Sequence, residues 1–419
     1  MILEELKRKL YETDLSELYP DRERALERLT ALIDGFGKKF GDRDGVMLLS
    51  VPGRSEICGN HTDHNGGVAI AAAINKDIVA VAARRTDGMV NVQSEGRRED
   101  SFSVDSASSP ANFPRYKSIG LIAGVVRGFM DRGYRVGGFD AYTMTEVLSG
   151  SGLSSSAAFE VMIGNILNHL YNEGKIPSTE IAKIAQFAEN EYFGKPSGLL
   201  DQMAAAVGGF VYLDFGGREA VVEPIDFSLS AAGYRLCIIG TGGSHSDLNE
   251  DYASIPREMK EVACALGKER LAGTTRCELM AAMPRLYRKL DDREILRAIH
   301  FVSECERVED MHLALMDGDM EKVLRLHTAS GHSSFEYLQN VYTTKHIDQG
   351  LSLAIALTER YLEGKGASVR VHGGGFAGTV QAIVPTEHVE DYRAFMDSVF
   401  GEGATMVLEV RGAGAVRII

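Results

Sequence analysis

The chain has 419 residues, with 45 lysines and arginines against 59 aspartates and glutamates, which leaves a formal net charge of −14. Hydrophobic residues make up 44 % and charged residues 25 %, the balance of a globular protein with a substantial core. The acidic excess argues against nucleic acid as the main partner, because a phosphate backbone attracts a basic surface. A chain of this length predicts two domains.

The cysteine pattern and the lack of long apolar runs argue against disulfide-rich, zinc-binding and membrane-spanning proteins. Five scattered cysteines include no Cys-x-x-Cys pair, so neither a disulfide framework nor a zinc site is expected. No stretch approaches the ~18–20 apolar residues of a membrane span, and the charged N-terminus does not resemble a signal peptide. We therefore expect a cytoplasmic protein without a membrane partner.

In chain order, apolar periodicity predicts two opening helices and then strands mixed with helices. Helices are expected at 3–11, 25–33, 119–130, 156–171, 178–193 and within the helix-rich stretch 253–332. Strands are expected at 46–51, 78–83, 89–93, 100–105, 139–144, 209–215, 236–239, 369–372 and 380–384. The strand over 46–51 is expected to enter a turn at Pro52-Gly53. Strands and helices are mixed along the chain but do not alternate strictly, which favours an α+β fold. We expect the domains at 1–220 and 221–419.

The loop Leu148–Ala158 is rich in glycine and serine, follows a predicted strand and opens a helix. Glycines let the backbone approach a ligand, and the free N–H groups of a helix start bind anions. Its serine hydroxyls can bind phosphate or Mg²⁺. The loop lacks the Gly-Lys-Ser/Thr ending of a Walker A motif. From these residues alone, a phosphate-binding loop and a flexible connection both remain open.

Two further segments combine glycines with polar side chains. In Val51–Gly67, two histidines and one aspartate fall within four positions, between apolar runs. Zinc is improbable there because no cysteine and no further spaced ligand group accompanies them. Asparagine and aspartate side chains suit the adjacent hydroxyls of a sugar equally well. In Val371–Val380, four glycines between two predicted strands indicate either close backbone approach to a ligand or a tight turn.

The order of these segments, "PGR…GNHTDHNGG", then "GSGLSSSAA", then "HGGGFAG", resembles the three motifs of the GHMP kinases. The first segment resembles the galactokinase signature in particular. Residues 188–202, "AENEYFGKPSGLLDQ", are similar to the galactokinase stretch with the catalytic aspartate, and Asn249–Tyr252 is similar to the family's sugar-contact segment. The resemblance implies a two-domain α+β fold with the active site in the cleft between the domains.

The resemblance also implies the role of each matching residue in an ATP- and Mg²⁺-dependent sugar-1-kinase. Asp201 corresponds to the residue that takes the proton of the C1 hydroxyl, and Arg54 to the residue that orients it. Ser156 and Glu189 correspond to Mg²⁺ ligands. The sugar contacts are expected at Asn60, His61, Asp63, Gly198 and Tyr252. The ATP phosphates are expected at Gly150, Ser151, Gly152, Leu153, Ser154, Ser155 and Ser156.

One departure from the family pattern affects the expected substrate. Asn60 stands where the family has a glutamate that contacts the C6 end of the sugar, and a neutral amide removes a repulsion against an anionic group there. A 6-carboxy sugar such as galacturonate, or another galacto-sugar, is therefore an alternative to galactose. A third hypothesis is a non-catalytic sensor of sugar and ATP. The retained Arg54, Asp201, Glu189 and Ser156 favour an enzyme.

Overall fold

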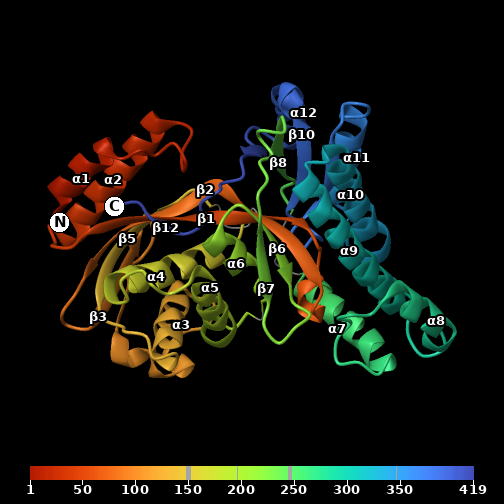
Figure 1. Ribbon diagram of the computed structural model, residues 1–419, viewed down its shortest axis with the longest axis horizontal. Helices are drawn as coiled ribbons and strands as arrows, with labels where there is room; N and C mark the ends of the chain where they lie inside the picture. Colours follow the sequence, from red (N-terminus) through yellow and green to blue (C-terminus); the bar gives the residue numbers. More distant parts are fainter. Residues whose placement is uncertain (148–151, 196, 244–247, 346) are drawn as a thin grey trace.

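The computed structural model describes residues 1–147, 152–195, 197–243, 248–345 and 347–419. Its larger sheet has the strand order β12-β1-β2-β5-β3-β4, and a β6-β7 hairpin branches from β2 (Figure 1). The pairs are antiparallel except β3 with β5. Its strands are β1 (Met47–Cys58), β2 (Val68–Arg84), β3 (Met89–Ser94), β4 (Asp100–Ser103), β5 (Phe139–Thr145), β6 (Phe210–Asp214), β7 (Val221–Ile225) and β12 (Val416–Arg417).

Alternating side chains of β1 and β2 build a hydrophobic cluster on each face of this sheet, as a period of two requires. Leu48 and Val81 pack under the N-terminal helices α1 (Leu3–Glu12) and α2 (Arg22–Phe40). Leu49 and Ala80 point the other way. That second face is covered by α3 (Ser118–Asp131), α4 (Ser155–Tyr171), α5 (Ser178–Phe187) and α6 (Leu200–Val207) (Figure 1).

The smaller sheet has four antiparallel strands in the order β11-β8-β10-β9 and helices around it. Its strands are β8 (Tyr234–Gly240), β9 (Ser368–His372), β10 (Thr379–Pro385) and β11 (Thr405–Leu408). The helices of this half are α7 (Asn249–Ala265), α8 (Arg276–Leu286), α9 (Asp292–Asp317), α10 (Met320–Ser333), α11 (Gly350–Tyr361) and α12 (Val389–Phe400). This mixture confirms the α+β prediction.

Short helices complete the secondary structure. The 3-10 turns are η1 (Asp63–Asn65), η2 (Val104–Ser108), η3 (Pro110–Asn112) and η6 (Thr386–His388). Two segments are π-helical, η4 (Ala188–Phe193) and η5 (Ser334–Leu338). The expected helix over 178–193 therefore begins as α5 and ends as η4. In the part of the chain that the structure describes, no helix has the length and apolar character needed to cross a membrane.

The expected turn at Pro52-Gly53 is wrong, because β1 continues through it to Cys58. The register with β2 shifts between Pro52 and Arg54 and again between Glu56 and Cys58. A strand can absorb a proline and a glycine where a bulge interrupts the ladder, since neither residue then has to fit a regular hydrogen-bond pattern. The irregular strand carries Arg54 and leads directly into the loop that begins at Gly59.

The expected domain boundary at 220/221 falls at the start of β7. The hairpin partner β7 begins at Val221, and β12, at the C-terminus, pairs with β1. Both strands belong to the larger sheet. We propose a division between β7 and β8, with the C-terminal strand returning to the first half.

Candidate active site

The guanidinium of Arg54 holds the carboxylate of Asp201 with two hydrogen bonds. Arg54 Nε lies 2.5 Å from Asp201 Oδ1, and Arg54 Nη2 lies 2.7 Å from Oδ2. Asp201 is in the first turn of α6, where the helix dipole favours a negative charge. Arg54 is buried on β1, whereas the Asp201 side chain is 30 % exposed. The pair therefore presents an oriented carboxylate at the surface of the site.

This environment keeps Asp201 ionised. Burial alone would raise the pKa of its carboxyl, but the charge and hydrogen bonds of Arg54, together with the Ser154 hydroxyl, lower the pKa below its ordinary value. Asp201 in turn raises the pKa of Arg54 against the effect of burial. An ionised carboxylate next to a fixed cation can accept a proton from a hydroxyl group.

The described end of the predicted phosphate loop lies against both residues of this pair. Gly150 and Ser151 lie outside the described residues. Gly152 and Ser154 both have left-handed backbone, with φ of 74° and 55°. The carbonyl of Gly152 accepts from Arg54 Nη1, and the carbonyl of Leu153 accepts from the Arg54 backbone N–H at 3.2 Å. The loop and the Arg54–Asp201 pair are thereby fixed to each other at the start of α4, which begins at Ser155.

The two residues predicted to bind Mg²⁺ are in contact. Ser156 Oγ donates to Glu189 Oε1 at 3.1 Å, and Gln202 Nε2 donates to Glu189 Oε2 at 2.9 Å. Glu189 lies in the π-helix η4, a rare geometry that is frequent at functional sites. Gln202 Nε2 also donates to Glu160, which is fully buried. Ser156 and Glu189 thus offer two hard oxygen ligands side by side.

This donor set fits a magnesium ion shared with a nucleotide. Mg²⁺ is commonly held by one or two protein oxygens plus substrate phosphates and water. Among the described residues no group of three or more His, Cys, Asp or Glu side chains could hold a metal by itself. Burial, followed by the nearby Glu189, raises the pKa of Glu160 well above its ordinary value. The protonated form of Glu160 is therefore favoured beside Glu189.

Two of the predicted sugar residues contact the third glycine motif, and two others lie against each other. His61, at φ 58°, donates from Nε2 to the carbonyl of Gly374 at 3.0 Å. Tyr252 Oη donates to the carbonyl of Gly375 at 2.6 Å. Asp63 lies against Gly198, where an added Cβ would be 1.8 Å from the aspartate Oδ2. Only glycine fits beside that carboxylate, which explains this residue type in the loop before α6.

Asn60 differs from these residues because its side-chain amide is used within the protein. The residue is 1 % exposed. Its Nδ2 donates to Glu56 Oε1 at 3.1 Å and to the carbonyl of Gly373 at 2.8 Å. Its Oδ1 accepts from Asn340 Nδ2 at 2.8 Å and from Ser334 Oγ at 3.3 Å. Both amide hydrogens and both acceptor positions of Asn60 are thus used by these four partners, which we call the Asn60 frame.

Two further side chains near the site, Glu304 and His372, were not among the residues predicted from the sequence. Glu304, buried on α9, accepts from the backbone N–H groups of Gly59 and Asn60 at 3.0 and 3.3 Å. His372 packs so closely against the phosphate loop that a Cβ at Gly152 would be 2.8 Å from its Nδ1. The position of His372 within a glycine motif was a usable signal. A single glutamate in a long helical stretch was not.

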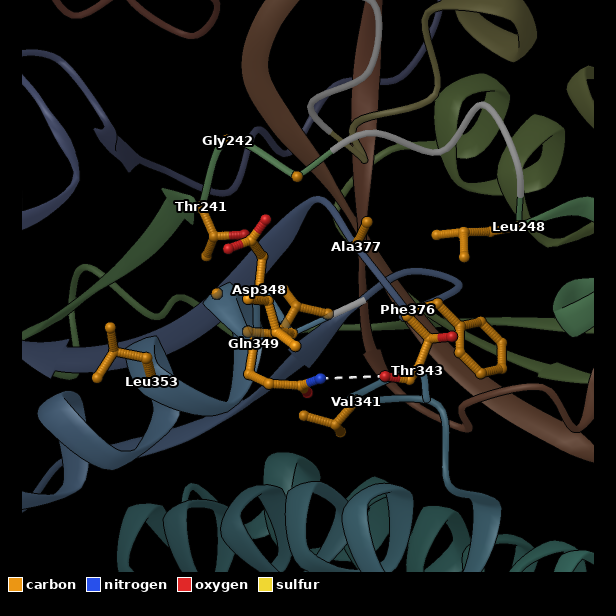
Figure 2. Close-up of a pocket in the computed structure, with 14 residues that line it drawn as sticks. Thr241, Gly242, Leu248, Val341, Thr343, Asp348, Gln349, Leu353, Phe376 and Ala377 are labelled. Atoms are coloured by element: carbon orange, nitrogen blue, oxygen red, sulfur yellow. Dashed lines mark hydrogen bonds between the residues drawn. The ribbon is translucent and has the colours of Figure 1, made fainter. Parts of the chain in front are cut away.

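A cavity of about 950 Å³ is lined in part by Phe376 and Ala377 of the third glycine motif (Figure 2). Phe376 contributes to its wall and also meets the Tyr252 ring edge-on, with ring centres 5.3 Å apart. Figure 2 shows Thr241 and Asp348 on the opposite side and the hydrogen bond from Gln349 Nε2 to the Thr343 carbonyl. The predicted catalytic residues do not line this cavity.

Comparisons with known proteins match the segments that contain these residues. The "GHMP kinases N terminal domain" model matches residues 120–209, and the "Galactokinase galactose-binding signature" model matches residues 34–84. The first range holds the phosphate loop, Glu189 and Asp201. The second holds Arg54 and the loop from Gly59 to Gly67.

Whole-chain relatives extend the match. The galactokinase of Streptomyces coelicolor is 31 % identical over 91 % of this chain and 98 % of its own length, and that of Limosilactobacillus reuteri is 32 % identical over 85 % and 90 %. The crystal structure of Lactococcus lactis galactokinase with galactose superposes with a TM-score of 0.80 at 25 % identity, covering 93 % of this chain and 99 % of that one. The mevalonate kinase of Methanococcus jannaschii shares the fold, with a TM-score of 0.62 at 15 % identity. The chain is a phosphotransferase that acts on a hydroxyl group and belongs to the galactokinase family of the GHMP kinases.

Proposed function

We propose that this protein transfers the γ-phosphoryl group of ATP to the anomeric hydroxyl of galactose, with Mg²⁺ as the metal. The observation that carries the proposal is the Arg54–Asp201 pair, held between the N-terminus of α6 and the end of the phosphate loop. Phosphoryl transfer depends mainly on positioning and on neutralising charge. The pair provides both, next to two oxygen ligands for the metal.

In the proposed reaction, Asp201 takes the proton of the C1 hydroxyl as that oxygen bonds to the γ-phosphorus and the bond to ADP breaks. Arg54 keeps the carboxylate ionised and aligned. Ser156 and Glu189 would hold Mg²⁺, which neutralises the β- and γ-phosphate oxygens when bound. The sugar hydroxyls would lie between Asp63, Tyr252 and His61. Burial lowers the pKa of His61 to about 4, so its imidazole is neutral.

The structure bears on the alternative substrate. The case for galacturonate depends on the Asn60 amide facing the C6 end of the sugar, and that amide donates to Glu56 and Gly373 instead. Galactose is therefore our first choice. The assembled Arg54–Asp201 pair also favours an enzyme over a sensor that does not turn over.

A coupled ADP-release assay across galactose, galacturonate, N-acetylgalactosamine and glucose tests the proposal. We expect turnover with galactose, and phosphorus NMR should identify the product as the 1-phosphate. Mg·ATP should also raise the melting temperature, because a ligand that binds only the native state stabilises it, by about 2.7 kcal/mol at 100 times its Kd. A folded sample with no turnover on any of the four sugars would contradict the proposal.

A further inference from the structure

Lys195 is a cation at the candidate metal site to which the family resemblance assigns no role. It lies in the segment between η4 and α6, and its Nζ is 3.2 Å from Glu189 Oε1. The same oxygen accepts the hydrogen bond from Ser156 Oγ at 3.1 Å. The Glu189 side chain is 3 % exposed, whereas that of Lys195 is 55 % exposed. A fixed, buried anion thus meets a cation whose side chain reaches solvent.

Glu189 needs such a cation when no metal is bound. Gln202 occupies its second oxygen at 2.9 Å, and Glu160 lies on the other side of Gln202, within 3.1 Å of the same amide nitrogen. Glu160 Oε1 and Gln202 Oε1 are buried without a hydrogen-bond partner among the described residues, so this corner is short of donors. A buried carboxylate without a counter-charge is strongly destabilising. Lys195 compensates that charge from the solvent side.

Lys195 and a metal ion compete for the same oxygen. A magnesium ion held by Ser156 and Glu189 would sit about 2.0–2.1 Å from each ligand oxygen, where the ammonium now approaches. Two cations repel each other at that separation, so the lysine has to leave when the metal arrives. Lysine carries its charge on a flexible stem and binds phosphate as a point charge. Asp201, the residue beside the transferred group, already interacts electrostatically with Lys195.

We propose that Lys195 forms an ion pair with the metal-binding carboxylate of Glu189 until Mg·ATP binds. The ammonium of Lys195 then binds the γ-phosphate oxygens instead. The inference rests on the proposed function, since it needs a nucleotide in the site. In the metal-free protein Lys195 stabilises Glu189. In the loaded protein it binds substrate and neutralises charge that develops on the transferred phosphoryl group.

Lys195→Met tests this proposal, with Lys195→Arg keeping the charge and Lys183→Met as a matched control. Lys183 makes an ion pair of similar length, 3.1 Å from Glu219, but with a carboxylate that is exposed to solvent. Lys195→Met should lower the melting temperature in EDTA, and millimolar MgCl₂ should restore it. Neither Lys195→Arg nor Lys183→Met should show this dependence on the metal.

The second measurement is the affinity for nucleotides by calorimetry. This affinity would not change if Lys195 only stabilised the fold. Lys195→Met should weaken the binding of a non-hydrolysable Mg·ATP analogue by about 10- to 100-fold, the range for a charged hydrogen bond, and should not weaken the binding of Mg·ADP. The Mg²⁺ concentration that half-saturates ADP binding should fall by up to about fivefold, since a half-exposed ion pair no longer competes. The kcat should fall together with the affinity for the analogue.

Two results would overturn the inference, and they are distinguishable. If Lys195→Met matches Lys183→Met in metal response, analogue affinity and kcat while galactose is phosphorylated, Lys195 has no such role and the proposed function stands. If the wild-type protein binds neither nucleotide, the proposed function fails, and the inference fails with it.

Discussion

Arg54 meets both carboxylate oxygens of Asp201, at 2.5 Å and 2.7 Å, and its remaining nitrogen donates to the carbonyl of Gly152. One planar guanidinium thus connects the proposed base to the phosphate loop, and its geometry matches the carboxylate fork. This single side chain therefore fixes the position of the Asp201 carboxylate relative to the loop.

Asp201→Asn removes the proposed base and keeps the shape of the side chain. We expect kcat to fall by about 10²- to 10⁴-fold, because a positioned base contributes a factor of this size. Affinity for Mg·ATP, measured by calorimetry, should stay close to that of the wild type, since Asp201 is proposed to contact the sugar and not the nucleotide. A variant with wild-type kcat would remove Asp201 from the mechanism.

Arg54→Lys keeps the positive charge and loses the planar guanidinium. A lysine ammonium is a point charge that cannot bond to both Asp201 oxygens and the Gly152 carbonyl in one plane. The pKa of Asp201, held below its ordinary value of 3.8 by Arg54, should rise. The acid limb of the kcat profile should therefore move to higher pH than in the wild type. An unchanged pH profile with a lowered kcat would show that Arg54 acts on the phosphate loop alone.

Asn60→Glu should destabilise the protein. A carboxylate at this buried position would face the Glu56 carboxylate and the Gly373 carbonyl, two acceptors that now receive the amide hydrogens. Leaving buried acceptors unpaired and adding a like charge should lower the free energy of unfolding by about 2–4 kcal/mol. Urea unfolding at neutral pH measures this loss.

Adding Glu56→Gln to Asn60→Glu reverses the donor and acceptor of this contact and serves as the control. The double variant should recover part of the lost stability, because the new amide can donate to the new carboxylate. Asn60→Glu alone could instead show wild-type stability and a changed preference among sugars. In that case Asn60 contacts the substrate, and its assigned role in the Asn60 frame is wrong.

Buried neutral histidines should make the protein sensitive to acid. Burial lowers the pKa of His327 to about 3 and that of His61 to about 4, and it also lowers the pKa values of His300 and His372. Between about pH 6.5 and these values the unfolded chain binds protons that the folded chain does not. The free energy of unfolding should therefore fall with pH in this window, by up to about 1.4 kcal/mol per pH unit for each histidine.

His327→Gln should reduce that slope and keep a hydrogen bond to Gln381, which the imidazole now contacts at 2.8 Å. The exposed histidine His332, replaced in the same way, is the control. Urea unfolding at pH 7.5 and pH 5.5 gives the slope for each protein. Equal slopes in the wild type and His327→Gln would contradict this origin of the acid sensitivity.

Local sequence patterns determined much of this molecule. Apolar runs in 46–51 and 78–83 indicated two strands of the sheet, because short apolar runs bounded by turn residues are typical of buried strands. The glycine motifs, with Arg54 and Asp201 beside them, indicated the family and the chemistry before any distance was known. These features depend on spacing along the chain, which a sequence displays directly.

Tertiary structure decided what the individual polar side chains do. The amide of Asn60 is bonded to Asn340, 280 positions away in the chain, and the ammonium of Lys195 meets Glu189 of the π-helix η4. The continuation of β1 through Pro52-Gly53 likewise depends on its pairing with β2. A hydrogen bond or ion pair requires atoms about 3 Å apart. Only the folded chain brings such distant residues within that range.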